Sequence, residues 1–387
     1  MPTSADVPSG RAEPGRERDR AARAEAAAAW RVAAIPHAAP EAVFNAYSDS
    51  GQGWTGGDST YAQRLPDGRV LWAFSDTFVG PVNADGSRPA TTAFVSNSFV
   101  VEEADASIHT VTGGTKEWPA PLIPSPADGW YWLGGRTLNG ENLDVMALRL
   151  QRTGEGQWDW QWAGNNLARF DSETLALKEL IPLPSNANIQ WSAWVLEEQE
   201  STYVYGVEEA DDAKYLHIAR VPGADLAAQP WEYWTGDDWS REEAASARVL
   251  SGVANEHSVT PWKDGYLLVT HDTSEAFNPR ILGYTAAAPT GPFSSPVELY
   301  RTPETGTDPQ VFTYNSHVQP HLSSDGSLLI SYNVNTMDPQ ALYRAGGTSI
   351  YRPRFVRVEL EAETPSTPEA PRGRGRTAPR PQTGRER

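Results

Sequence analysis

A short hairpin phrase recurs along this chain and constrains its fold more than any other feature. RLPDGRVLWAFSD (64–76), TPWKDGYLLVTHD (260–272) and HLSSDGSLLISYN (321–333) each place an Asp-Gly turn before an apolar strand that ends in a polar residue. Asp-Gly between strand-like runs is a strong hairpin signal. The spacing of the copies is too uneven for a tight repeat, but it suits sheets arranged as blades around an axis.

Five such units can be counted. They run from Trp54 to Val101, Trp130 to Leu180, Gln190 to about Trp239, Asn255 to Leu299, and Asn315 to Leu360. Fifteen Trp, 14 Tyr and 10 Phe, with 32 Gly and 31 Pro, favour short strands and many turns. A parallel sheet would need helices between strands, and none of convincing length is evident. The sequence therefore predicts an all-β, five-bladed β-propeller over residues 36–360, with 44–53 supplying a strand that closes the ring.

The two ends of the chain differ from this middle part. Residues 1–35 are polar and rich in Arg, Glu and Ala, which predicts a disordered segment that leads into a short helix near 20–33. Residues 361–387 are rich in Pro, Arg and Gly, which predicts a disordered tail. The tail is either a solvated end or a basic contact for an acidic partner.

Charge and composition narrow the classes of partner. The net charge of −18 repels phosphate backbones, so we expect no nucleic acid on the propeller, and a neutral carbohydrate fits better. No apolar run is long enough for a membrane helix. The absence of cysteine excludes disulfides and thiolate chemistry. We expect no cofactor, although a structural calcium ion is compatible with the sequence.

The N-terminal sequence bears on localisation. Arg23 and Glu25 interrupt the Ala-rich run 21–29, so it is a poor signal-peptide core. As written, the protein is expected to be cytoplasmic; a misassigned start would make it a secreted protein.

Three acidic residues are the candidate catalytic groups. Asp58 follows two glycines in GWTGGDST, and Asp76 ends an apolar strand in WAFSDTF. A carboxylate in such a position is costly unless it is paired, solvated or functional, although both could simply cap turns. Glu256, in NEHSVTPW, could be a general acid if burial raises its pKa, or an exposed residue before a strand.

Other side chains could line a sugar-binding mouth where the blades converge. Tryptophan rings stack on sugars, and His, Asn and Glu side chains bind hydroxyls, although buried packing between blades is the better explanation for most of the tryptophans. The candidate substrate-binding residues are Trp54, Glu141, Trp191, His257, His317 and Asn333.

At these residues the chain resembles the five-bladed propeller glycoside hydrolases, the broad group that contains arabinanases, levansucrases and invertases. It is more similar to a related domain family of unknown function, some members of which are endo-D-arabinanases. The resemblance spans residues 44–360 and is carried by GWTGGDSTYAQRLPDGRVLWAFSDTFVG, NSFVV, YNSHVQPHLSSDGSLLISYNVN and YRPRFVRV. It implies a nucleophile or base at Asp58, a tuning carboxyl at Asp76 and a Glu as acid. Glu256 is assigned by its blade alone, because its surroundings match no motif.

We therefore predict that the protein hydrolyses a polysaccharide with two carboxyl groups. The resemblance implies an arabinan-like polymer. Two alternatives stay open. A non-catalytic carbohydrate-binding propeller would have the same mouth without turnover. A protein-interaction scaffold would have an apolar or charged outer patch and no polar mouth.

Overall fold

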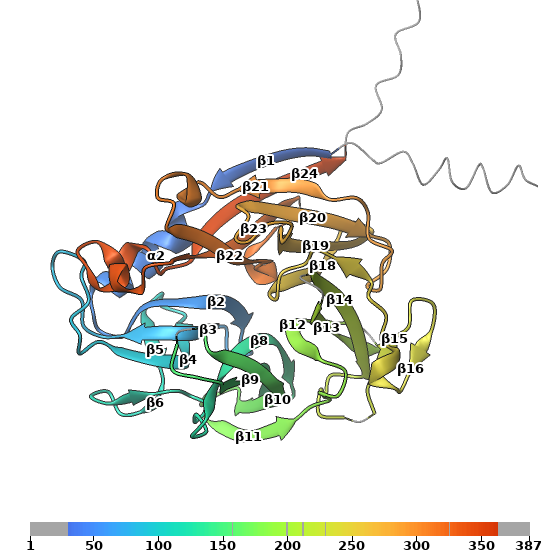
Figure 1. Ribbon diagram of the computed structural model, residues 1–387, viewed down its shortest axis with the longest axis horizontal. Helices are drawn as coiled ribbons and strands as arrows, with labels where there is room; N and C mark the ends of the chain where they lie inside the picture. Colours follow the sequence, from blue (N-terminus) through green and yellow to red (C-terminus); the bar gives the residue numbers. More distant parts are fainter. Residues whose placement is uncertain are drawn as a thin grey trace, which may run out of the picture.

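The computed structural model describes residues 30–362 apart from 157, 199, 211–212, 229 and 325. Five antiparallel sheets surround a common axis, which confirms the predicted five-bladed propeller (Figure 1). The predicted tails lie outside the described residues, except for the short pieces 30–35 and 361–362.

The first two blades each have four strands. Blade one contains β2 (Trp54–Arg64), β3 (Val70–Val79), β4 (Ala93–Glu102) and β5 (Ile108–Val111), and a small pair, β6 (Gly113–Gly114) and β7 (Pro119–Ala120), follows it. Blade two contains β8 (Gly129–Asn139), β9 (Asn142–Arg152), β10 (Trp160–Asp171) and β11 (Leu177–Pro182).

The remaining three blades are also antiparallel sheets. Blade three contains β12 (Ile189–Glu197), β13 (Ser201–Ala210), β14 (Ala213–Pro222), β15 (Glu232–Trp234) and β16 (Trp239–Ser240), with β17 (Leu250–Ser251) pairing with β14. Blade four contains β18 (His257–Trp262), β19 (Gly265–His271), β20 (Arg280–Ala286) and β21 (Val297–Arg301). Blade five contains β22 (Val311–Val318), β23 (Ser327–Thr336), β24 (Arg354–Ala362) and β1 (Trp30–Pro36).

Burial changes from the axis to the periphery of each blade. The second strand of blade two, β9, carries the apolar run LDVMAL and is buried on both faces, whereas the outermost strand β11 is largely exposed. This pattern follows from packing every blade between two neighbours. The largest buried cluster joins residues of blades one to four, such as Tyr61, Leu133, Trp194 and Val259. Blade five packs in two other clusters, one shared with blade four and one with blade one.

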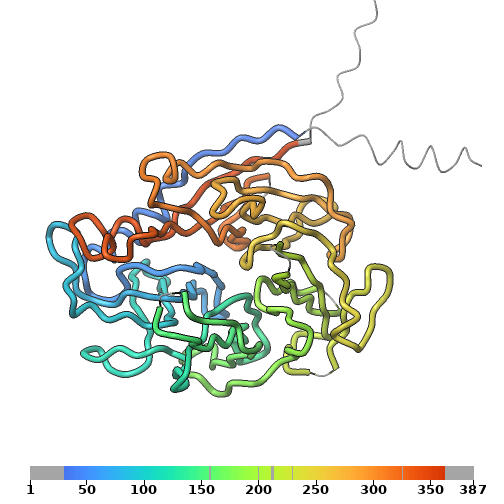
Figure 2. The backbone as a smooth tube through the Cα atoms, in the orientation of Figure 1, coloured from blue at the N-terminus to red at the C-terminus, as the bar shows by residue number. Residues whose placement is uncertain are grey.

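The strand that closes the ring is not the predicted segment 44–53. β1 pairs with β24 over seven residue pairs, from Trp30 opposite Ala362 to Pro36 opposite Val356, so the first and last described residues of the chain lie in this blade (Figure 2). The expected closing segment 44–53 instead contains the second half of helix α2 (Ala38–Asp49), and residues 30–33 are strand rather than the predicted helix. Trp30, Val32 and Ala34 alternate toward the core, which is the period of a strand.

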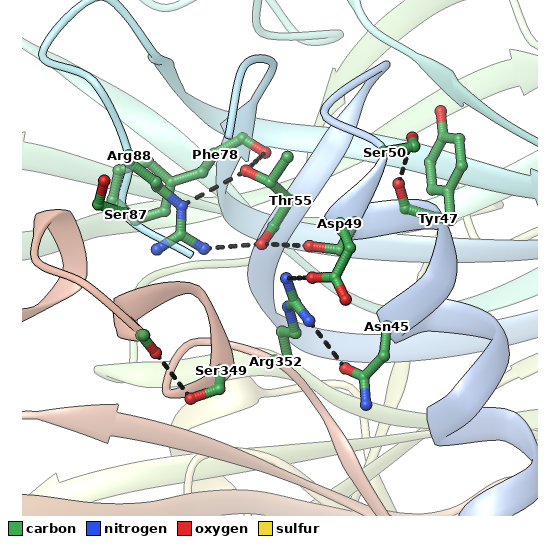
Figure 3. A network of polar contacts seen from close by, with 12 residues as sticks. Asn45, Tyr47, Asp49, Ser50, Thr55, Phe78, Ser87, Arg88, Ser349 and Arg352 are labelled. Atoms are coloured by element: carbon green, nitrogen blue, oxygen red, sulfur yellow. Dashed lines mark hydrogen bonds and ion pairs between the residues drawn. The ribbon is translucent and has the colours of Figure 1, made fainter. Parts of the chain in front are cut away.

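Two arginines fix the junction between the first and last blades (Figure 3). Arg352 donates hydrogen bonds to Asn45 Oδ1 (3.0 Å) and Asp49 Oδ1 (2.7 Å) of α2. Arg88 donates to the carbonyl oxygens of Thr55 (2.7 Å) and Leu342 (2.8 Å). These contacts satisfy buried backbone groups and hold the loop before β24 against strand β2.

The innermost strands of four blades, one, two, three and five, have an irregular register. Pairing is interrupted at Asp58 and before Tyr61 in β2, and between Leu133/Arg136, Gln190/Trp194 and Tyr314/His317 in β8, β12 and β22. Bulges re-aim side chains and are common beside active sites. In β8 the bulge holds Gly134, where an added Cβ would lie 2.2 Å from the Ser192 carbonyl oxygen, so only glycine permits this approach.

Candidate active site

An axial cavity of about 1250 Å³ opens at the level of these bulges. All five blades contribute to its lining, including Asp58 and Asp76 from blade one, Trp132 from blade two, Gln190 from blade three, Glu256 from the start of blade four and Tyr314 from blade five. The three predicted catalytic carboxyl groups therefore lie in one cavity although they are separated by up to 198 positions in the chain.

Asp58 is held by two tyrosines. Its Oδ2 accepts hydrogen bonds from the hydroxyl groups of Tyr314 (2.7 Å) and Tyr351 (2.9 Å). Its Oδ1 is enclosed and has no hydrogen-bond partner among the described residues. Burial raises the pKa of Asp58 to about 6, and the two tyrosine donors limit that rise because they stabilise the carboxylate.

Asp76 lies close enough to Asp58 for the two charges to interact. Its Oδ1 accepts a hydrogen bond from Trp132 Nε1 (3.0 Å), and its φ of 21° is unusual for a residue other than glycine. Burial, followed by the negative charge of Asp58, raises the pKa of Asp76 to about 8. At neutral pH the pair therefore carries one charge, held on Asp58.

Glu256 is oriented by the bulges of blades one and five. Its Oε1 accepts hydrogen bonds from Ser59 Oγ (2.7 Å) and Asn315 Nδ2 (2.9 Å). Ser59 and Asn315 have φ values of 67° and 54°, so both donors occupy left-handed backbone positions. Burial, followed by the charge of Asp58, raises the pKa of Glu256 well above its usual range, which favours the protonated form of this carboxyl group.

A packed layer of side chains lies behind the carboxyl groups. His317 stacks on Tyr61 with ring centroids 4.3 Å apart, and Arg136 lies 5.0 Å from the Trp194 ring. The Nε2 of His317 lies 3.1 Å from the Thr60 carbonyl oxygen, and its Nδ1 lies 4.0 Å from Glu256 Oε2. Burial lowers the pKa of His317 to about 3, so the ring is neutral and supplies packing rather than charge.

The six predicted substrate-binding residues do not line the cavity in the described structure. His257, His317 and Asn333 are fully or almost fully buried; His317 adjoins Glu256, and Asn333 donates to Thr60 Oγ1 (2.8 Å). Placing them on sugar subsites is therefore corrected, because they have no exposed edge toward the cavity.

The other three lie farther from the site. Trp54 and Trp191 are fully buried, Trp54 against Phe44 and Phe74 and Trp191 against Trp231. Glu141 is exposed in the β8–β9 turn, whereas the cavity is lined by residues from the opposite end of β8. A subsite role for these three is corrected on position: the tryptophans fill the space inside blades, and the glutamate is at the wrong end of its hairpin.

Several residues of the site were not predicted from the sequence. Tyr314, Asn315 and Tyr351 lie inside the segments that carried the family resemblance, and Trp132 lies in the aromatic run WYWLGG. Their proximity to Asp58, Asp76 and Glu256 depends on the bulges and on the loop before β24, neither of which leaves a periodic signal. The nearest sequence signal was the concentration of polar and aromatic residues at the start of inner strands.

Comparison with known proteins identifies the family of the chain. A family model described as a domain of unknown function (DUF5005) matches residues 41–361. The chain belongs to this family. Two curated fungal proteins match parts of it: notoamide biosynthesis cluster protein J' of Aspergillus versicolor is 27% identical over 136 residues, and protein J of Aspergillus sp. (strain MF297-2) is 29% identical over 131. The chain spans about a third of the length of these relatives, and each match covers about a third of the chain.

Solved structures share the fold of this DUF5005 protein. A provisionally assigned hydrolase from Bacteroides ovatus ATCC 8483 is 23% identical with a TM-score of 0.71, over 84% of this chain and 90% of that one. A family 117 glycoside hydrolase, Zg3597 of Zobellia galactanivorans, is 10% identical with a TM-score of 0.47, over 81% and 86% of the two chains. The first likeness shows the fold, and the second is too low to add to it.

Two features are absent from the described residues. No helix among them is long and apolar enough to cross a membrane. No group of three or more His, Asp or Glu side chains among them has an arrangement that could hold a metal ion.

Proposed function

We propose that this protein is a glycoside hydrolase that cleaves its substrate in the axial cavity with two carboxyl groups. The observation that carries the proposal is that three buried acids in one cavity have different hydrogen-bond partners. Burial favours the protonated form of Glu256, whereas two tyrosine hydroxyls stabilise the charged form of Asp58, whose pKa burial raises to about 6. Pairs of acids whose pKa values are driven apart are typical of glycosidases, in which one carboxyl must donate a proton while another stays charged.

Each group has a distinct role in this proposal. Glu256 donates its proton to the glycosidic oxygen as the bond to the anomeric carbon breaks. The Asp58 carboxylate either attacks the anomeric carbon, forming an intermediate that water then hydrolyses, or takes a proton from the attacking water. Ser59 and Asn315 position Glu256, and the two tyrosines position Asp58. Asp76, protonated and bonded to Trp132, keeps a second charge away from Asp58.

The proposal specifies a carbohydrate substrate and no particular sugar. A cavity lined by both polar and aromatic side chains fits a glycan and disfavours the scaffold alternative, which expects no polar mouth. An arabinan-like polymer stays a prediction from the sequence resemblance, and cytoplasmic or secreted localisation stays a prediction from the N-terminal sequence.

The proposal is tested by incubating the protein with arabinans, galactans, fructans and xylans and assaying new reducing ends. Wild-type protein should release sugar from at least one glycan, and Asp58→Asn should lose that release by a factor of about 10³ or more because it removes the charged group. Glu141→Gln, a carboxyl change outside the cavity, should cleave like the wild type. Release that persists in Asp58→Asn would contradict the proposal.

A further inference from the structure

Exposed aromatic rings are concentrated around the cavity. Among the described residues, seven large hydrophobic side chains are exposed, and three of these line the cavity: Phe94 (53% exposed), Trp158 (62%) and Phe277 (40%). Large rings left in water around a polar site are typical of binding surfaces. Phe94 and Phe277 each begin a series of packed rings that leads into the cavity, and Trp158 lies in the loop before a third wall, in blade two.

The first wall leads from Phe94 to Asp58. The Phe94 and Phe78 ring centroids are 4.8 Å apart, and those of Phe78 and Tyr351 are 5.8 Å apart. The Tyr351 hydroxyl donates to Asp58 Oδ2. An apolar surface therefore runs from the exposed rim to the charged carboxyl group without interruption.

The second wall reaches the same oxygen atom from blades four and five. Phe277 and Phe312 have ring centroids 4.0 Å apart, and Phe312 and Tyr314 have centroids 5.4 Å apart. The Tyr314 hydroxyl also donates to Asp58 Oδ2. Two series of rings thus end at one carboxylate oxygen.

The third wall belongs to blade two and ends at Asp76. Trp160 and Trp132 pack edge to face with centroids 4.8 Å apart, and Trp132 Nε1 donates to Asp76 Oδ1. Trp158 precedes β10 in the same hairpin and also lines the cavity.

The wall contributed by blade three is different. Its described lining residues are Gln190, Ser192, Glu209 and Lys214, none of which carries an aromatic ring. The cavity therefore has an aromatic part, formed by blades one, two, four and five, and a polar part at blade three. A ligand that fills both has a hydroxyl-rich portion and an apolar portion.

The charge of the lining restricts the ligand further. Among the described lining residues, six are acidic (Asp58, Asp76, Glu209, Glu256, Asp272 and Glu275) and two are the basic residues Arg152 and Lys214. Burial favours the neutral forms of Asp76 and Glu256, so four carboxylates face two cations. A uronate or sulfate group would meet this excess of negative charge, so an anionic sugar is disfavoured.

From this division we infer that the preferred substrate is a neutral glycoside with an apolar, ring-bearing aglycone. The inference rests on the proposed hydrolase function and specifies its substrate class. The sugar occupies the carboxyl end of the cavity, and the aglycone packs between the three aromatic walls. Cleavage releases the aglycone as an alcohol or phenol that carries the proton from Glu256, while water supplies the hydroxyl group of the free sugar.

The aromatic walls can be tested without turnover by isothermal titration with 2-naphthol. Wild-type protein should bind this probe, and Trp158→Ala and Phe277→Ala should each raise its Kd about fivefold or more, since one aromatic contact is worth roughly 1 kcal/mol. Trp118→Ala is the matched control, because Trp118 is 82% exposed and does not line the cavity. Equal Kd values in all four proteins, or no binding by the wild type, would overturn the inference even if a glycan is hydrolysed.

Turnover supplies the second arm. For a sugar that the enzyme releases, the 2-naphthyl glycoside should have a kcat/KM at least about tenfold above that of the methyl glycoside, and Phe277→Ala should lower only the former. Equal use of the methyl glycoside, or of an oligosaccharide of that sugar, would contradict the substrate class. If no glycoside is cleaved at all, the hydrolase proposal fails, and the naphthol titration still decides whether the aromatic walls bind apolar rings.

Discussion

Burial disfavours the charged forms of both Asp58 and Glu256, but two tyrosine hydroxyls stabilise the charged form of Asp58. The two groups therefore titrate in different pH ranges. We expect kcat/KM to rise with pH through about 6, as Asp58 ionises, and to fall where Glu256 loses its proton. Glu256→Gln should lower the rate and abolish the alkaline limb while keeping the acidic one. A profile without an acidic limb near pH 6 would exclude Asp58 as the charged group.

Asp76 should destabilise the protein increasingly as the pH rises. Its pKa in the folded state is about 8, above the usual value of 3.8, so the folded state binds the proton more tightly and stability falls between about pH 4 and pH 8. Asp76→Asn cannot ionise, and its advantage over the wild type should grow by about 3–4 kcal/mol between pH 5 and pH 8, because the folded wild type keeps the Asp76 proton over most of that range. Denaturant unfolding at both pH values measures this, with Glu141→Gln as a control that shows no growth. A constant difference would mean that Asp76 is not held in its neutral form.

The sequence indicated the acids of the site but not their surroundings. Asp58 and Asp76 were identifiable because a carboxyl group beside glycines, or at the end of an apolar strand, needs a reason. The aromatic and amide partners Tyr314, Tyr351 and Asn315 were not, because their contacts cross 59 to 293 positions of chain. Trp54 and Trp191 were misplaced for a related reason: a buried tryptophan and a sugar-stacking tryptophan look alike in a sequence.

The strand that closes the ring shows where local reading of elements succeeds and fails. The Asp-Gly hairpins placed the blades close to their observed positions, because turn residues and period-two strands are local signals. β1 was missed because it completes a sheet whose other strands lie some 275 residues or more away in sequence, at β22, β23 and β24. Its alternation covers only seven residues, and its environment is determined by the opposite end of the chain.

This closure gives a prediction for a single strand. Val32 of β1 packs against the core cluster of blades four and five, whereas its neighbour Ala33 is exposed. Val32→Asp should therefore lower the free energy of unfolding by about 1–3 kcal/mol, because it places a charge against apolar side chains. Ala33→Asp, on the opposite face of the same strand, should change it by less than about 0.5 kcal/mol. Thermal unfolding compares the two; equal effects would mean that β1 does not contribute to the core.

The whole ring makes the site possible, because five blades each bring one irregular region of an inner strand, or the residue before it, to the same axial cavity. Removing any one blade would take away a catalytic carboxyl group, a positioning group or a wall of the cavity. The acidic lining of the cavity and the net charge of −18 agree in sign, which is consistent with the neutral substrate that we propose.

Cleavage by the axial carboxyl groups is tested most directly by following one neutral glycan by proton NMR, which reports binding and new anomeric signals in the same sample. We predict binding and cleavage by the wild type, binding without cleavage by Asp58→Asn, and wild-type behaviour by Glu141→Gln. Binding by the wild type with no new anomeric signal would make the protein a carbohydrate-binding propeller, and equal cleavage by Asp58→Asn would place the chemistry elsewhere.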